Sequence, residues 1–134
     1  MGFVSGIKIT HLDEKKSVAE VPCRWLNKNP FQSMYFAVQS MAAEVSTAAH
    51  VFLALKGLDA SVAMIIAELK ADFVKKAQSK TRFTCSDYKK INAAIKQLKQ
   101  ADDTVLVTAE TIGRDEAGDE VARFYFTWSF KRRR

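Results

Sequence analysis

The sequence predicts an α+β fold in which a curved antiparallel sheet wraps around one long helix. Residues 33–56 contain neither proline nor glycine and are rich in small apolar side chains, as a long buried helix requires. The segments on both sides of it alternate polar and apolar residues, which is typical of β-strands. Short turns join consecutive strands, which favours an antiparallel sheet, and a helix this apolar is buried only if the sheet curls around it.

The first quarter of the chain predicts two strands. In residues 6–12 the side chains of Ile7, Ile9 and His11 fall on one face of an alternating segment. Residues 18–25 form a second, shorter strand, in which Pro22 favours an edge position or a bulge because proline cannot donate a ladder hydrogen bond. The predicted helix follows and is ended by Gly57. Since it is apolar on most sides, we expect protein to surround most of it.

The second half predicts four more strands and a short helix. The continuous apolar run within residues 61–75 is typical of a strand at the centre of a sheet. The remaining expected elements are a strand at 80–86, a surface helix at 88–100, a strand at 104–112, a hairpin connection at 113–118 and a last strand at 121–130. One face of that last strand carries an aromatic row, expected to be core or, alternatively, to line an acyl tunnel: Phe124, Phe126, Trp128 and Phe130.

The length of 134 residues suits one domain, and we expect residues 1–134 to form it. Folding buries roughly two-thirds of the surface that an unfolded chain of this size exposes, enough for a core without a stabilising metal. Cys23 and Cys85 stand apart from each other and from any histidine cluster, which argues against a disulfide and a structural zinc site. We therefore expect no metal and no cofactor.

The N-terminal segment MGFVSGIKIT lacks the basic start and unbroken apolar run of a signal peptide, so the cytoplasm is the expected location. Polar residues interrupt the long helix too often for a membrane span, which needs about 20 predominantly apolar residues.

The net charge of +6 invites a nucleic-acid interpretation, but the positive charges are gathered in two places. Four lie in residues 131–134 and four lysines lie in residues 88–100; once these are set aside, acidic residues slightly outnumber basic ones. A nucleic-acid-binding domain usually has a basic face built into its fold. Nucleic acid is therefore not the expected partner, and the C-terminal residues are expected to be a solvated tail, although either cluster could meet a phosphate.

Two stretches resemble motifs of one enzyme superfamily. Residues 29–37, NPFQSMYFA, lead to Glu44; they are similar to an entry loop in which Asn precedes a His-Gly-Gly step and an acid follows within the helix. Counted from Asn29, Tyr35 occupies the His position, Phe36 the first glycine and Glu44 the acid. Residues 67–77, AELKADFVKKA, resemble a strand that ends in aromatic-x-x-Pro-Ala, with lysine in place of proline.

Together with the element order, these stretches resemble the hotdog fold of acyl-thioester enzymes, in an uncharacterised branch of the thioesterase superfamily. The resemblance implies a homodimer, or a dimer of such dimers, whose sheets join edge to edge and whose clefts receive an acyl chain and a pantetheine arm. It implies hydrolysis of acyl-CoA or a related thioester, with coenzyme A present only as part of the substrate. A non-catalytic acyl-thioester or lipid-binding module is the alternative, since the glycines and the histidine are replaced.

Glu44 is the strongest candidate for chemistry. At 100° per residue it lies on one stripe with Ser33, Ser40 and Thr47, which we expect to contact the substrate. A carboxylate within an apolar helix is costly to bury unless it is paired, protonated or open to a wet cleft. Burial would raise its pKa, which suits a general base that activates water. The alternative is a structural ion pair with a lysine or arginine of a strand or of a second subunit.

The start of the helix offers unpaired backbone amides near Tyr35, Phe36 and Ala37, and these can hold a thioester carbonyl oxygen. Alternatively, Ser33 or Asn29 caps them. Tyr35 and Asn29 are expected to position the reactants; the alternatives are a packed tyrosine and a turn residue.

The two histidines are not expected to be catalytic. His50 lies about 240° around the helix from Glu44, which excludes a dyad on one face and favours a core or interface position. His11 is expected to be structural. A dehydratase, which on this fold pairs a histidine with an acid, is therefore not favoured.

Overall fold

The fold is described by a computed structural model, which covers residues 6–24, 33–56 and 58–134. It confirms the predicted order of strands and helices. The elements are β1 (Lys8–Leu12), β2 (Ser17–Val21), α2 (Phe36–Leu55), β3 (Val62–Phe73), β4 (Thr81–Cys85), α3 (Tyr88–Ile95), β5 (Thr104–Arg114) and β6 (Glu120–Arg132).

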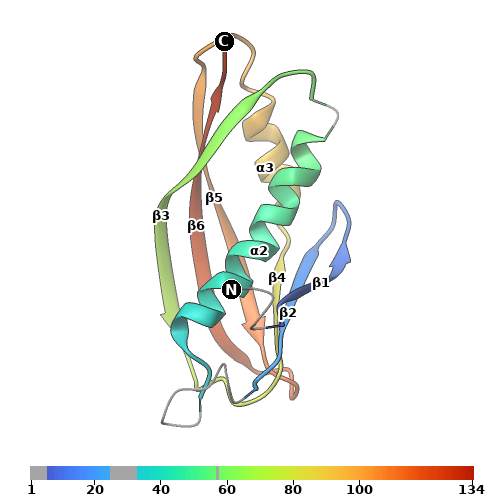
Figure 1. Ribbon diagram of the computed structural model, residues 1–134, viewed down its shortest axis with the longest axis vertical. Coiled ribbons are helices and arrows are strands. Elements are labelled where there is room, and N and C mark those ends of the chain that lie inside the picture. Colours follow the sequence, from blue (N-terminus) through green and yellow to red (C-terminus); the bar gives the residue numbers. More distant parts are fainter. Residues whose placement is uncertain (1–5, 25–32, 57) are drawn as a thin grey trace.

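The six strands form one sheet in the order β1-β2-β4-β5-β6-β3, and every neighbouring pair is antiparallel, as predicted. Figure 1 shows β3, β5 and β6 running along the length of the molecule, with α2 lying obliquely across one face of the sheet. The second helix, α3, packs beside α2 and against β5. Among the described residues no helix is long and apolar enough to cross a membrane.

The aromatic row of β6 is core, as predicted: all four side chains are buried. α2 faces this row with small residues such as Ala42 and Ala43, which let the helix lie close to the sheet. Two buried hydroxyl contacts fix its position. Ser46 Oγ and Thr111 Oγ1 lie 2.7 Å apart, and Trp128 Nε1 donates to Thr47 Oγ1 at 3.2 Å.

Protein covers most of α2, as predicted, but one side of the helix keeps an exposed strip. Phe36 and Phe52 are 60% and 61% exposed, and Glu44 is exposed between them. The sheet covers one side of the helix, where Val38, Gln39, His50 and Val51 are buried beside the small residues, and leaves a strip on the opposite side exposed.

The position of β3 also differs from the prediction. Its apolar run indicated the sheet centre, but β3 lies at the edge and pairs only with β6 among the described strands. Ile65 on the outer face is 66% exposed and Leu69 on the inner face is 49% exposed. The apolar run of β3 predicts that both faces of the strand are buried, but in the single chain both faces are partly exposed.

Three element ends differ from the predicted ends for local reasons. β2 stops at Val21 because Pro22 cannot continue the ladder. α2 begins at Phe36 rather than Ser33, because Met34 N donates to Ala77 O at 2.8 Å and is held by the strand side of the molecule. α3 ends at residue 95 rather than 100 and gives way to turns.

The basic C-terminus is largely exposed to solvent, as expected, but it is not a free tail. β6 continues through Arg132, whose Nη1 donates to Leu98 O at 2.9 Å and to Lys99 O at 3.1 Å. Arg134 Nε donates to Asp102 Oδ2 at 2.7 Å. These bonds hold the segment after α3 against the end of the sheet, so part of the positive charge is structural.

The close approach of β4 and β5 generates a prediction at Gly113. This residue pairs with Phe83, and a Cβ built on it would lie 2.7 Å from the Phe83 Cζ atom, in a fully buried ring. We expect Gly113→Ala to lower the free energy of unfolding by about 1–3 kcal/mol, the usual cost of overpacking. Urea denaturation measures this. In a Phe83→Leu background the same change should cost less; equal costs in both backgrounds would contradict the steric explanation.

Candidate functional site

The N-terminus of α2 is set by the segment before it. Met34 is buried and bonded to Ala77, and Tyr35 is extended, with φ −55° and ψ 140°. The helix therefore starts abruptly at Phe36, and no side chain of the described residues caps it, while Asn29, one of the two predicted caps, lies outside them. Within the described residues no group accepts a hydrogen bond from the amides of Phe36, Ala37 or Val38. These amides, at the positive end of the helix dipole, are available to an oxygen of a ligand.

The side chains beside these amides are aromatic. Phe36 stacks on Phe73 at the end of β3, with ring centroids 3.9 Å apart and planes inclined by 22°. Phe73 in turn meets Phe124 edge-to-face at 5.6 Å, which connects the start of α2 to the core. The Phe36 ring thus lies against β3. Tyr35 is 45% exposed at the same end of the helix.

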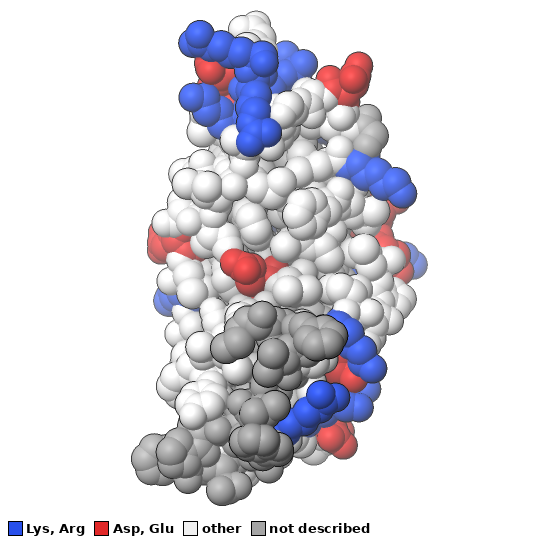
Figure 2. Space-filling model, in the orientation of Figure 1, with Lys and Arg blue, Asp and Glu red and all other residues white. Residues whose placement is uncertain are grey.

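Glu44 does not have the enclosed environment that the sequence predicted. Its side chain is exposed, and its carboxylate has neither an ion pair nor a hydrogen bond among the described residues. The alternative of a structural ion pair is therefore not found within the described part of this chain. Glu44 is the only charged residue of α2. Figure 2 views the molecule from the side of α2 and shows acidic atoms near the middle of a largely uncharged face.

The other predicted site residues separate. Ser40 is half-buried on the helix and lies on the side of Glu44. Ser33 is buried ahead of the helix. Thr47 is fully buried; its hydroxyl donates to Glu44 O at 3.0 Å and accepts from Trp128. Of the four residues of the predicted stripe, only Ser40 and Glu44, in its middle, reach the surface. Asn29 lies outside the described residues.

The histidines have structural surroundings. His50 is a core residue, as predicted: it is fully buried, and its Nε2 lies 2.9 Å from Asp13 O, which can only accept. His11 lies 2.8 Å from Asp13 Oδ2, an acid two positions along that the sequence interpretation overlooked. A bond from the Lys16 amide, followed by those from His11 and Lys15, lowers the pKa of Asp13 to about 2. Among the described residues neither histidine contacts Glu44, the acid of α2.

Cys85 is not suited to nucleophilic chemistry. Burial raises the pKa of the Cys85 thiol to about 12, so the thiolate that would attack a substrate is disfavoured. Cys23 Sγ contacts Ala77 O at 3.7 Å.

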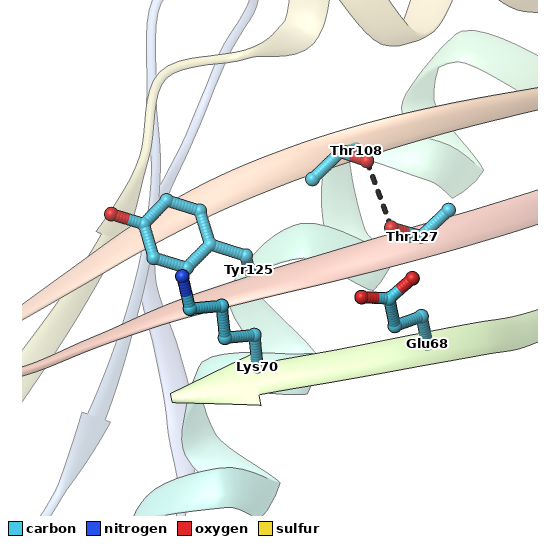
Figure 3. A pocket seen from close by; sticks show the side chains of 5 residues that line it. All are labelled: Glu68, Lys70, Thr108, Tyr125 and Thr127. Carbon is cyan, nitrogen blue, oxygen red and sulfur yellow. Dashed lines mark hydrogen bonds between the residues drawn. The ribbon is translucent and has the colours of Figure 1, made fainter. Parts of the chain in front are cut away.

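Away from the predicted site residues, a pocket of about 280 Å³ lies on the outer face of the sheet, on the side away from α2. Figure 3 shows its five side chains, which come from β3, β5 and β6: Glu68, Lys70, Thr108, Tyr125 and Thr127. Lys70 Nζ lies 5.8 Å from the centre of the Tyr125 ring, and the threonine hydroxyls are 2.8 Å apart. Glu68 has no hydrogen bond or ion pair among the described residues, and none of the predicted site residues lines this pocket.

A model of one protein family, described as a domain of unknown function (DUF4442), matches residues 3–130. The chain belongs to this family. Comparison with curated proteins gives no significant match.

Several solved structures share the fold. A Pseudomonas aeruginosa protein of unknown function, described as a probable thioesterase, is 23% identical, with a TM-score of 0.81 over 98% of this chain and 88% of that one. A Chlorobaculum tepidum protein of unknown function is 13% identical, with a TM-score of 0.84 over 97% and 85%. A Haemophilus influenzae thioesterase is 14% identical, with a TM-score of 0.72 over 98% and 82%. This DUF4442 protein therefore has the hotdog fold that the resemblance predicted, and it shares that fold with structures described as thioesterases.

The aromatic contact at the start of α2 can be tested by a double-mutant cycle. We expect Phe36→Ala and Phe73→Ala to be non-additive, with a coupling of about 0.5–1.5 kcal/mol, because each ring loses the same stacked partner. Chemical denaturation of the two single variants and the double variant measures the coupling. Full additivity would mean that the two rings do not stabilise each other.

Proposed function

We propose that this DUF4442 protein is a thioester hydrolase that acts on acyl-CoA or a related acyl thioester. The observation that carries the proposal is the carboxylate of Glu44 on an uncharged face, on the same helix as the N-terminal amides, all without a partner among the described residues. The likeness to thioesterases in fold supports the choice of substrate class.

The proposed reaction divides the work between these groups. The amides of Phe36 and Ala37 hold the carbonyl oxygen of the thioester and stabilise the negative charge that develops on it. Glu44 accepts a proton from a water molecule, whose oxygen attacks the carbonyl carbon. The carbon–sulfur bond then breaks, and the leaving thiolate takes up the proton from Glu44. The products are a carboxylic acid and a free thiol.

Helix geometry places a condition on this site. Phe36 and Glu44 are eight positions apart, which is about 12 Å along the axis of α2. One chain can bring both to the same carbonyl only if the Glu44 side chain and the attacking water together reach back toward the start of the helix. Two copies related by a two-fold axis relax this condition, because antiparallel helices bring the N-terminus of one beside the middle of the other. We therefore propose a homodimer whose sites each combine amides of one chain with Glu44 of the other.

The exposed surfaces fit such a dimer. β3 presents a long edge with no partner strand among the described residues, and an uncovered edge of this kind pairs readily with another strand. Beside it, Leu69, Phe73 and Phe36 expose 49%, 41% and 60% of their surface. A second copy joined at β3 would cover these side chains and the open side of α2. A dimer of such dimers stays a prediction.

The remaining predicted residues have supporting places in this proposal. Tyr35 is exposed next to the amides and can donate its hydroxyl to the substrate, and Ser40 lies between them and Glu44 on the helix. Asn29 keeps its predicted role of orienting a reactant, as a proposal from the sequence alone. The cytoplasmic location stays a prediction as well.

A non-catalytic acyl-thioester-binding module is the second candidate, and Phe36 favours it. The ring occupies the place where the resemblance implies glycine, and its stack on Phe73 narrows the approach to the amides. Such a module would be stabilised by a non-hydrolysable acyl-CoA analogue and would release no thiol from acyl-CoA.

Glu44→Gln tests the hydrolase. We expect thiol release from acyl-CoA to fall by about 10²–10⁴-fold in kcat, the usual contribution of a general base. Stability should change by no more than about 0.5 kcal/mol, because the exposed carboxylate has no partner in the described structure. Glu116→Gln, an exposed acid on the β5–β6 turn, is the matched control and should retain activity. Equal activity of Glu44→Gln and the control would remove Glu44 from the reaction.

Leu69→Glu tests the dimer. The substitution puts a charge on the inner side of the β3 edge, and we expect a monomer by light scattering together with loss of thiol release. Leu106→Glu is the control: this leucine is 61% exposed on β5, away from the edge, and the variant should stay dimeric. A dimeric Leu69→Glu protein would show that the subunits join elsewhere.

A further inference from the structure

A small basic pocket lies where β1 begins and β2 ends, outside the site described above. Its volume is about 160 Å³. It is lined by Gly6, Lys8, Glu20, Pro22, Arg24 and Lys80, and Arg82 lies beside it on β4.

One buried carboxylate organises the cations. Glu20 has a side chain only 7% exposed; its oxygens lie 2.9 Å from Arg82 Nε, 3.5 Å from Lys80 Nζ and 3.9 Å from Lys8 Nζ. Burial alone raises the pKa of Glu20, but the Arg82 hydrogen bond and the charges of Lys80 and Arg82 outweigh it, so the pKa is lowered. The carboxylate is thus anionic at neutral pH, and with Arg24 four cations surround a single negative charge.

The pocket keeps room and donors for an anion. Gly6 has a φ of +77°, and a Cβ built on it would lie 3.1 Å from both Arg24 Nη1 and Pro22 Cγ, so glycine leaves this space open. Arg24 has no ion pair among the described residues. Arg82 uses Nε for Glu20, and its two Nη groups make no hydrogen bond within the described structure. Guanidinium groups with free N–H donors match the geometry of phosphate.

The pocket lies close to the start of α2. Cys23 Sγ and Met34 N both contact the carbonyl oxygen of Ala77, at 3.7 Å and 2.8 Å. Arg24 directly follows Cys23, and Phe36 lies two positions after Met34. Their backbones are therefore at most about 20 Å apart. Figure 2 shows basic side chains gathered at the lower right, at the end of the molecule where Figure 1 places the start of α2.

We propose that this basic pocket binds the phosphate groups of a nucleotide carried by the substrate, which makes the substrate a coenzyme A thioester. The inference rests on the proposed function, because it identifies coenzyme A as the group to which the acyl chain of the same substrate is joined. Coenzyme A joins its sulfur to a phosphorylated nucleotide through a long flexible arm, so the thioester can reach the amides of α2 while its phosphates occupy the pocket. A thioester on a carrier protein has no such nucleotide.

Binding of 3′,5′-ADP, measured by titration calorimetry at low salt, tests the assignment without turnover. We expect Arg24→Gln to weaken binding about tenfold or more, as loss of a charge-assisted contact does, and high salt to weaken it further. The exposed Arg134→Gln, at the other end of the molecule, is the matched control and should bind as the unmodified protein does. Equal binding by the Arg24 variant, or equal losses in both variants, overturns the proposal. So does inorganic phosphate, or a vesicle of anionic lipid, binding as tightly as the nucleotide.

Kinetics separate this inference from the function on which it rests. We expect Arg24→Gln to raise KM for acyl-CoA about tenfold and to leave acyl-pantetheine, which lacks the nucleotide, unchanged. Hydrolysis of both substrates with no effect of the variant on either overturns the pocket and leaves the hydrolase intact. Absence of hydrolysis with Arg24-dependent ADP binding contradicts the hydrolase and supports the nucleotide pocket.

Discussion

The way in which α2 rests on the sheet governs the rest of this structure. Small side chains line its buried side, and two hydroxyl contacts, Ser46 to Thr111 and Trp128 to Thr47, hold it against β5 and β6. A helix fixed so closely over the middle of the sheet covers only part of that face. Its opposite side and the inner side of β3 therefore stay open, and these two open surfaces adjoin each other at Phe36 and Phe73.

The open surfaces give the candidate site its character. The carboxylate of Glu44 lies exposed on an uncharged helix face without a partner in the described chain, which leaves it accessible for the role that we propose. The axial separation of about 12 Å between Glu44 and the helix N-terminus favours the dimer that we propose, since groups from two copies can approach one carbon more directly. Assembly and chemistry are therefore linked in the function that we propose.

Charge is divided between structure and recognition. At the C-terminus, Arg132 and Arg134 bond to the segment after α3, and this part of the positive charge stabilises the fold. At the other end, Glu20 gathers more cations than it neutralises, and the excess is available to an anion. The net charge of the chain could not distinguish these two uses, because it counts both alike.

Local patterns in the sequence determined the elements, their order and the buried aromatic row of β6, because the periodicity of a strand or helix is set by residues a few positions apart. The same patterns also identified Glu44 and the amides at Phe36 as candidates for the site that we propose. Tertiary structure alone decided that β3 is an edge, that Phe36 stacks on Phe73, and that Glu20 meets Arg82, 62 positions away. Each of these depends on which distant segments become neighbours, and a local pattern carries no information about that choice.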